Sequence, residues 1–244
     1  MGSFPDGVYR AQFPYYYRNP EGMPQEAALD YYLNSIKDVF EQCGPADSIA
    51  AIVVQPLQGE GGFIPAPIEW VKAVRKICDE NGILLVADEV QTGFCRTGRM
   101  FATQYWEEAG VQPDILATAK SIAAALKTIE IMERDDLAGR SCEIGEKVSK
   151  RFNEWKEKYP VIGDVRGLGG MIGLEFVKDQ ESKEPYPEFS AAVIKGCAQK
   201  GLMIEGAGTY GNVIRFLAPL VMTDEQLEAG LDIYESVIKE LLEK

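Results

Sequence analysis

The sequence predicts an α/β fold in which a parallel-sheet domain is followed by a smaller α+β domain. Three short, apolar segments, at residues 49–54, 83–87 and 114–118, are typical of strands that are covered on both faces of a parallel sheet. Segments with helical periodicity alternate with these strands, as in parallel doubly wound sheets. From about residue 135 the pattern changes to long helices and a glycine-rich hairpin. We therefore predict one domain over residues 1–134 and a second over residues 135–244.

The elements of the first domain follow in chain order. Residues 1–24 are rich in proline, glycine and aromatic residues, which predicts an extended arm. Apolar residues recur at helical spacing over 25–42, and the helix is expected to stop at Gly44-Pro45. A strand over 49–54 (IAAIVV) leads to a loop at 58–62 (QGEGG). A helix over 67–81, a strand over 83–87 (ILLVA), a short helix over 105–109 and a strand over 114–118 (DILAT) complete the domain.

The second domain is predicted to begin with a long charged helix that runs to Tyr159. A glycine-rich stretch over 163–177 (GDVRGLGGMIGLEFV) resembles a hairpin, and a helix near 189–200 follows it. Two strands near 202–206 and 212–217 and a final helix over 223–242 complete an α+β arrangement.

Composition and charge exclude several classes of function. The chain has 244 residues, with 25 Lys and Arg against 38 Asp and Glu, so its net charge of −13 argues against nucleic-acid binding. No apolar run approaches the roughly 18 residues that span a bilayer, and the first residues lack the pattern of a signal peptide. We therefore expect a cytoplasmic protein without a membrane segment.

The reactive residue types narrow the chemistry further. The five cysteines are scattered and never spaced C-x-x-C, which fits reduced thiols better than disulfides or zinc ligands. The chain contains no histidine, so Ser-His-Asp catalysis and histidine-ligated metals are excluded. We predict no metal site.

Two ionisable residues follow predicted strands at the edge where α/β sheets bind ligands. Asp88 follows ILLVA, and Lys120 comes shortly after DILAT. A lysine at a helix start has a lowered pKa, and the neutral amine is the nucleophile of Schiff-base chemistry. A carboxylate opposite it suits a pyridinium nitrogen. For each residue taken singly, the sequence favours the interpretation of Lys120 as a solvated loop charge and of Asp88 as a cap or turn residue.

Three motifs in order decide between these interpretations. VQPLQGEGGF (54–63), DEVQTGFCRTG (88–98) and PDILATAKSIA (113–123) resemble the class III aminotransferases, which are pyridoxal-phosphate enzymes of fold type I, and within them the 4-aminobutyrate aminotransferase group. Residues 163–177 and 212–231 are similar to the C-terminal domain of that family. The resemblance covers nearly the whole chain and implies an incomplete fold type I large domain with a small C-terminal domain.

The resemblance implies roles for four residues around the cofactor, pyridoxal 5'-phosphate. Lys120 would form the Schiff base and move the proton at the substrate carbon. Asp88 would pair with the pyridine nitrogen, Val90 would pack on the ring, and Gln91 would approach its phenolic oxygen.

It also implies a substrate switch. Arg215, in VIRFLAPL, matches the arginine that binds the substrate α-carboxylate, and Glu60, in QGEGG, matches the carboxylate that neutralises this arginine when no such group is bound. The alternative interpretation of both residues is a structural ion pair or a loop charge.

The sequence also departs from the family pattern. The family's N-terminal part, including its phosphate-binding loop, has no counterpart here, and AKSIA runs directly into AALKTIE, where the family inserts a few dozen residues. Gln55 stands where the 4-aminobutyrate group usually has a substrate-facing glutamate, and Cys95 replaces a glycine. Because missing strands leave sheet edges and apolar faces uncovered, we expect this chain to need a partner chain or to fold poorly.

Two hypotheses of function follow. In the first, the chain is a transaminase that transfers an amino group from an ω-amino acid such as 4-aminobutyrate to 2-oxoglutarate through Lys120, as a homodimer or with a partner chain. In the second, it is a non-catalytic remnant or interaction module. A third possibility, an acid pair made by Asp88 and Glu89, is disfavoured because adjacent residues on a strand point to opposite faces.

Overall fold

The computed structural model describes residues 7–118 and 122–243, which divide into two compact units. The first, here the parallel unit, comprises Met1–Val54, Ala66–Asp88 and Tyr105–Ala117. The second, the antiparallel unit, comprises Gln55–Pro65, Glu89–Gln104 and Thr118–Lys244. The predicted boundary between residues 134 and 135 stays a prediction.

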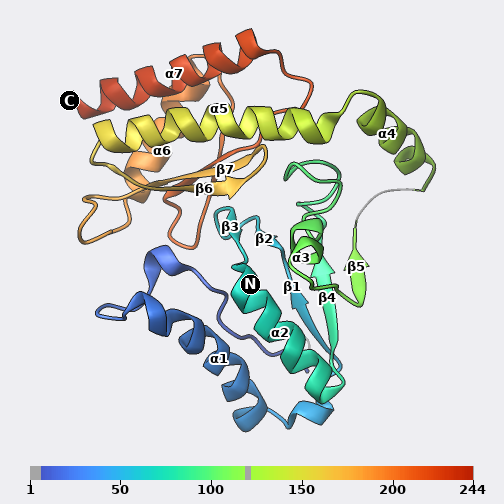
Figure 1. Ribbon diagram of the computed structural model, residues 1–244. Helices are drawn as coiled ribbons and strands as arrows, with labels where there is room; N and C mark the ends of the chain where they lie inside the picture. The colour runs from blue at the N-terminus through green and yellow to red at the C-terminus, as the bar shows by residue number, and fades with distance from the viewer. Residues whose placement is uncertain (1–6, 119–121, 244) are drawn as a thin grey trace. The chain divides into compact units, whose positions relative to one another are not determined.

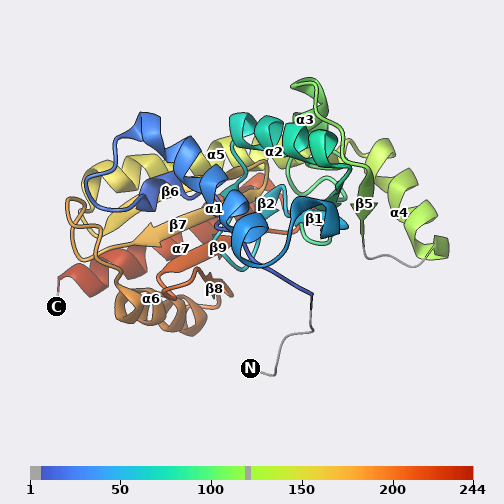
Figure 2. The same ribbon diagram turned by 90° about the horizontal axis from the view of Figure 1, so that it is seen from below.

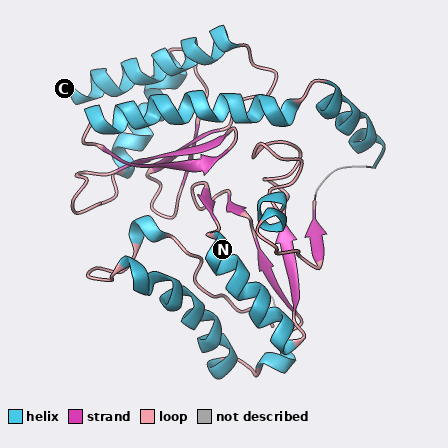
Figure 3. Cartoon of the chain, in the orientation of Figure 1, coloured by secondary structure: helices cyan, strands magenta, loops and turns pink. Residues whose placement is uncertain are grey.

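The parallel unit contains the predicted α/β sheet (Figures 1 and 3). Its strands are all parallel and lie in the order β1-β4-β5. These are β1 (Ala51–Val54), β4 (Leu84–Asp88) and β5 (Ile115–Ala117). Helix α1 (Ala28–Gln42) precedes β1 in the chain, α2 (Ile68–Asn81) lies between β1 and β4, and α3 (Gln104–Glu108) lies between β4 and β5. Short 3-10 helices lie at Tyr16–Arg18, Gln25–Ala27 and Ala46–Ser48, so the predicted extended arm is only partly extended. The α/β class and the strand positions are confirmed.

Helices α1 and α2 cover one face of this sheet. Tyr32 on α1 and Trp70 and Val74 on α2 are buried with Leu85 of β4 in one apolar cluster. Helix α2 ends at Gly82, whose φ of +68° is the left-handed conformation that favours glycine at a helix C-terminus. The amphipathic periodicity of the two helices thus predicts their packing.

The opposite face of the sheet is uncovered, which corrects the expectation of strands buried on both faces. Val53 is 65 % exposed, Leu84 44 % and Ile115 46 %. Adjacent strand residues point to opposite faces, so Val54 is buried while Val53 is not. The apolar composition of the strands is typical of a sheet with protein packed on both faces. No element that the structure describes packs on this second face. This agrees with the predicted uncovered apolar faces.

The antiparallel unit is built on a four-stranded sheet with the order β6-β7-β9-β8 (Figure 2). Its strands are β6 (Ile162–Leu168), β7 (Met171–Phe176), β8 (Glu205–Ala207) and β9 (Val213–Phe216). Its helices are α4 (Ile122–Arg134), α5 (Leu137–Lys158), α6 (Pro187–Gln199) and α7 (Asp224–Leu242). A separate hairpin joins β2 (Leu57–Gln58) to β3 (Ile64–Pro65). The predicted glycine-rich hairpin is confirmed as β6–β7.

An aromatic cluster forms the core of this unit. Phe152 and Trp155 of α5 pack against Tyr234 of α7, with ring centroids 5.6 and 5.4 Å from that of Tyr234. Helix α7 begins at a capping box in which Thr223 Oγ1 accepts from the Gln226 backbone and the Gln226 side chain accepts from the Thr223 backbone. Helix α5 therefore lies against both β6 and α7.

Two elements differ from the sequence-based expectation. A helix was expected to begin near Lys120, but the extent of α4 to Arg134 was not predicted, and α5 begins at Leu137 after Asp136, whose side chain accepts a hydrogen bond from the Gly139 backbone. The predicted loop at 58–62 is the turn of the β2–β3 hairpin, because its strands are only two residues long and give no periodic signal.

The described helices include none that is long and apolar enough to cross a membrane. Among the residues that the structure describes, no group of three acidic or cysteine side chains is arranged to hold a metal ion.

Candidate active site

Three of the predicted site residues meet within the antiparallel unit. Arg215, on β9, donates through Nη1 to Glu60 Oε1 at 2.6 Å. Gln91 donates through Nε2 to the same oxygen at 3.1 Å. One carboxylate thus joins residues that are 31 and 155 positions away in the sequence.

The two partners of this ion pair differ in exposure. The Arg215 side chain is only 12 % exposed, whereas that of Glu60 is 73 % exposed. The hydrogen bond from Gln91, followed by that from Arg215, lowers the pKa of Glu60, so the carboxylate is ionised at neutral pH. Because Arg215 is held in place and the Glu60 carboxylate is exposed, a ligand carboxylate could displace Glu60 from Arg215.

Arg215 has further contacts that fix its position. Its Nη2 donates to Glu205 Oε2 at 2.9 Å, and Glu205 lies directly across from it on β8. The guanidinium carbon lies 5.9 Å from the ring centroid of Phe63. The Arg215 Nε is buried and has no hydrogen-bond partner among the described residues. One donor of the guanidinium is therefore still available to a bound group.

The loop that carries Glu60 depends on glycine. A Cβ atom added to Gly59 would overlap the Gln91 side-chain amide in its present position, so a larger residue here would require the Gln91 side chain to move. The Glu60 carbonyl accepts a hydrogen bond from the Gly208 backbone at 2.9 Å. The backbone of the loop is thus held while its carboxylate extends into solvent.

A buried carboxylate orders the segment that carries Val90 and Gln91. Glu89 is fully buried and accepts hydrogen bonds from Thr92 Oγ1 at 2.5 Å, the Ala102 backbone at 3.1 Å and the Thr103 backbone at 2.7 Å. These bonds close residues 89–103 into a loop. Within it, Val90 is 55 % exposed, so its apolar surface is available to a ligand.

The remaining predicted site residues lie elsewhere. Asp88 is the last residue of β4 in the parallel unit, at the carboxyl end of the strand as predicted. Lys120 lies outside the described residues. The structure therefore assembles Glu60, Gln91 and Arg215, and the association of Asp88 with Lys120 stays a prediction.

Comparison with known proteins identifies the family. A sequence profile of the family Aminotransferase class-III matches residues 1–126 and 121–238. The chain belongs to this family. The resemblance found in the three motifs is confirmed, and the fold is that of transaminases.

Individual relatives are similar over almost the entire chain. A probable 4-aminobutyrate aminotransferase from Bacillus subtilis is 37 % identical over 274 residues, covering 98 % of this chain and 62 % of its own. A 5-aminovalerate aminotransferase from Pseudomonas putida is 38 % identical, covering 99 % of this chain and 62 % of its own. The crystal structure of a PLP-bound amine transaminase from an uncultivated Pseudomonas species has a TM-score of 0.86 and 28 % identity, covering 98 % and 63 % of the two chains. The chain thus spans less than two thirds of the length of these relatives.

The comparison also supports the predicted internal shortening. The alignment with the Bacillus protein has 274 positions and this chain has 244 residues, so at least 274 − 244 = 30 positions have no residue here. The two family matches meet at residues 121–126, directly after Lys120. The missing family segment therefore falls at or near residues 121–126, a range that includes the start of helix α4.

Sequence reasoning missed three residues of the site. Glu205 and Phe63 contact Arg215, and Gly59 makes room for Gln91. Two consecutive strands were predicted near residues 202–206 and 212–217, but neither their antiparallel pairing nor the register that sets Glu205 opposite Arg215 was predicted, because the register depends on the connecting turn.

Proposed function

We propose that this chain is a pyridoxal-phosphate-dependent transaminase that takes an amino group from an ω-amino acid such as 4-aminobutyrate and passes it to 2-oxoglutarate. Family membership supports the amino-transfer chemistry. The relatives named for 4-aminobutyrate and 5-aminovalerate support an ω-amino donor. The single observation that carries the proposal is the pairing of a nearly buried Arg215 with the exposed Glu60.

The residues present fit the ring of the cofactor. Val90 exposes apolar surface, and Gln91 supplies an amide beside it. Asp88 supplies a carboxylate at the end of a parallel strand. We assign Asp88 to the ring nitrogen, Val90 to the ring face, Gln91 to the phenolic oxygen and Lys120 to the attachment of the cofactor. The phosphate group is left without an assigned residue.

Pyridoxal phosphate, when bound, supplies an electron sink for the electron pair released when the substrate loses a proton. Lys120 provides the amine that takes this proton from the substrate carbon and returns it. A carboxylate such as Asp88 keeps the ring nitrogen protonated through a charge-assisted hydrogen bond. Val90 holds the ring against one side and excludes water there.

Arg215 and Glu60 explain how one site takes two kinds of substrate. The α-carboxylate of 2-oxoglutarate or glutamate binds Arg215, and Glu60 turns away into solvent. When 4-aminobutyrate binds, no α-carboxylate is present, and Glu60 neutralises Arg215. Without Glu60, Glu205 alone would remain to balance the partly desolvated guanidinium in that half of the reaction.

The proposal includes a cytoplasmic location and assembly as a homodimer or with a partner chain. Val53, Leu84 and Ile115 leave an apolar sheet face exposed, which favours burial against additional protein. The same observation, together with the length of the relatives, favours a second candidate function, that of a non-catalytic remnant or interaction module.

One experiment separates the two candidates. The purified chain is incubated with pyridoxal phosphate, 4-aminobutyrate and 2-oxoglutarate, and glutamate formation is measured. A transaminase forms glutamate, and the Lys120→Ala variant does not, while Lys127→Ala, which removes an exposed lysine of α4, remains active. Equal, background-level glutamate formation by all three proteins would establish the non-catalytic alternative.

A further inference from the structure

A small cavity lies inside the antiparallel unit, beside but distinct from the ion pair of Arg215 and Glu60. Its volume is about 270 Å³, and its walls come from segment 90–96, helices α4 and α5, and segment 219–221. Most of the lining side chains are apolar, including Phe94, Met132 and Leu220. Arg96 is the only charged residue in the described lining.

Arg96 has an unusual environment for an arginine. Its Nη1 donates to the Ala218 carbonyl at 3.0 Å, and among the residues that the structure describes it forms no ion pair. Burial lowers the pKa of its guanidinium, without a compensating carboxylate. Acidic residues outnumber basic residues in this chain by 38 to 25, so the absence of an acidic partner for Arg96 among the described residues is not due to a shortage of acids. A partly buried guanidinium left with a carbonyl partner is therefore suited to an external anion.

The backbone around Arg96 is firmly held. Its carbonyl accepts hydrogen bonds from Ser141 Oγ at 2.9 Å and from the Gly170 backbone at 3.1 Å. Ser141 Oγ in turn accepts from Gly170 at 2.9 Å. A side chain that starts from a fixed backbone loses less conformational entropy when it binds a ligand.

We propose that this cavity is a binding site for a small organic monocarboxylate with an apolar chain, which Arg96 anchors by its carboxylate. A guanidinium matches the two oxygens of a carboxylate in a bidentate pair. The apolar walls accommodate the chain. A phosphate fits less well, because its charge of nearly two needs several donors and the lining offers one cation.

Val90 and Gln91, which we assign to the cofactor ring, also line this cavity, but the anchoring residue Arg96 has no role in the cofactor chemistry. Arg96 and Arg215 are different cations with different partners, since Arg215 is already paired with Glu60 and Glu205. A ligand at Arg96 therefore needs neither Lys120 nor pyridoxal phosphate. A failure of cofactor binding would leave this inference standing.

Calorimetric titration of the full chain with hexanoate tests the site. We expect hexanoate to bind, hexan-1-ol to bind at least tenfold more weakly, and inorganic phosphate not to displace hexanoate. Arg96→Gln is expected to weaken hexanoate binding by roughly tenfold or more, because a charge-assisted pair is lost. Arg99→Gln is the matched control, because Arg99 contacts the Gly98 carbonyl and does not line the cavity. The affinity of this variant for hexanoate should equal that of the wild-type chain.

A second variant keeps the test decisive if Arg96→Gln folds poorly. Val221 lines the cavity and is 75 % exposed, so Val221→Trp adds bulk at the cavity without disturbing the core and should also weaken binding. Undetectable hexanoate binding at millimolar concentration would overturn the proposal, as would equal affinity in the wild-type and Arg96→Gln proteins or displacement by phosphate. Loss of binding in Arg215→Gln with retention in Arg96→Gln would place the carboxylate at the other arginine and would equally overturn it.

Discussion

Arg215 and Glu60 form an ion pair of 2.6 Å between a nearly buried arginine on a strand and an exposed carboxylate on a hairpin turn. Because the arginine is fixed by Glu205 and the glutamate carries its charge on an exposed side chain, the glutamate is the partner that moves. A ligand carboxylate at Arg215 therefore competes with Glu60.

Glu60→Gln tests this competition. Removing the charge should improve the affinity of Arg215 for glutarate about two- to fivefold, the range expected for the loss of an exposed competing ion pair. Calorimetric titration measures the dissociation constant. Glu181→Gln, which removes a charge from an exposed loop position, serves as the control and should leave the affinity unchanged. An unaltered or weaker affinity in Glu60→Gln would show that Glu60 does not compete for Arg215.

Glu89→Ala should destabilise the chain strongly. The substitution leaves the buried backbone N–H groups of Ala102 and Thr103 without acceptors, at a cost of about 1–3 kcal/mol for each. Chemical denaturation measures the change in free energy of unfolding. Glu107→Ala, at an exposed position, should change it by no more than about 0.5 kcal/mol. Similar stabilities of the two variants would refute the structural role of the Glu89 carboxylate.

Two helical glycines should respond in opposite directions to substitution by alanine. A Cβ at Gly145 of α5 would overlap the Gly169 carbonyl. This is a backbone group, so a change of side-chain rotamer cannot relieve the clash. A Cβ at Gly230 of α7 would lie 3.5 Å from Leu202 Cδ1, an ordinary contact. Gly145→Ala should therefore lower the melting temperature, whereas Gly230→Ala should stabilise the protein by up to about 1 kcal/mol through helix propensity. If both substitutions stabilise the protein, helix α5 does not approach the β6–β7 turn as closely as described.

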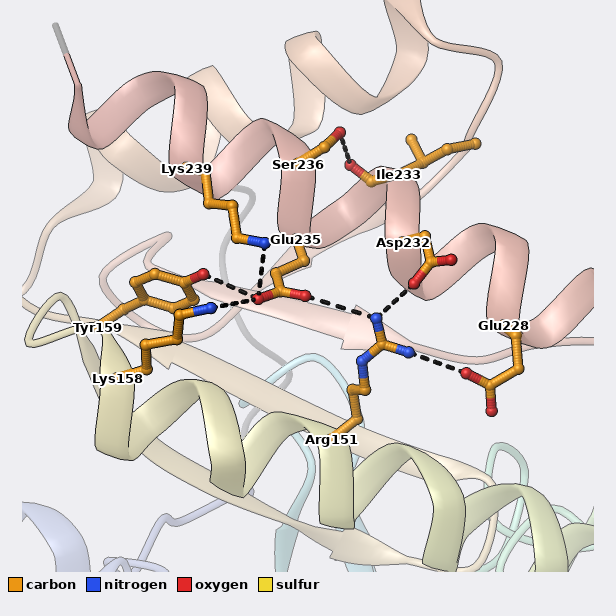
Figure 4. A network of polar contacts seen from close by, with 9 residues as sticks. All are labelled: Arg151, Lys158, Tyr159, Glu228, Asp232, Ile233, Glu235, Ser236 and Lys239. Atoms are coloured by element: carbon orange, nitrogen blue, oxygen red, sulfur yellow. Dashed lines mark hydrogen bonds and ion pairs between the residues drawn. The ribbon is translucent and has the colours of Figure 1, made fainter.

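Glu235 of α7 gives the chain a pH-dependent stability (Figure 4). Burial opposes its charged form, but hydrogen bonds from Tyr159, Lys158 and Lys239 outweigh this and lower the pKa of Glu235 from 4.5 to about 2. Because the pKa of Glu235 is lower in the folded chain than in the unfolded chain, its ionised carboxylate stabilises the fold at pH values above 4.5. This stabilisation is lost as the pH falls from 4.5 toward 2.

Glu235→Gln should therefore be less stable than the wild-type chain at pH 7, and the difference should shrink as the pH falls from 4.5 to 2. Denaturation at several pH values provides the measurement. Glu228→Gln, at a side chain that is 51 % exposed, serves as the control, and its free energy of unfolding should differ much less from that of the wild-type chain. A difference for Glu235→Gln that does not vary with pH would contradict the hydrogen-bond network.

Much of the fold could be predicted because it depends on local patterns. The strand at 83–87 is apolar and lies between turn residues, and helix α2 ends at a glycine in the left-handed conformation. A helix was expected to begin near Lys120, but the extent of α4 was not predicted because its first turn lies where the chain departs from its family. The exposure of Val53 could not be predicted from its residue type, since burial depends on a layer that other segments must supply.

The site was predictable to a similar degree. The motifs identified Glu60, Gln91 and Arg215, and the structure brings these together. Glu205 was missed because its role depends on strand register, and Arg96 because its lack of an acidic partner is a property of three-dimensional packing.

We propose that Lys120 holds the cofactor, and reductive labelling tests this most directly. The purified chain is incubated with pyridoxal phosphate, reduced with borohydride, digested and analysed by mass spectrometry. Our account predicts one pyridoxyl group per chain, located on Lys120 and absent from the Lys120→Ala variant. Labelling spread evenly over exposed lysines such as Lys127, or no labelling, would contradict it.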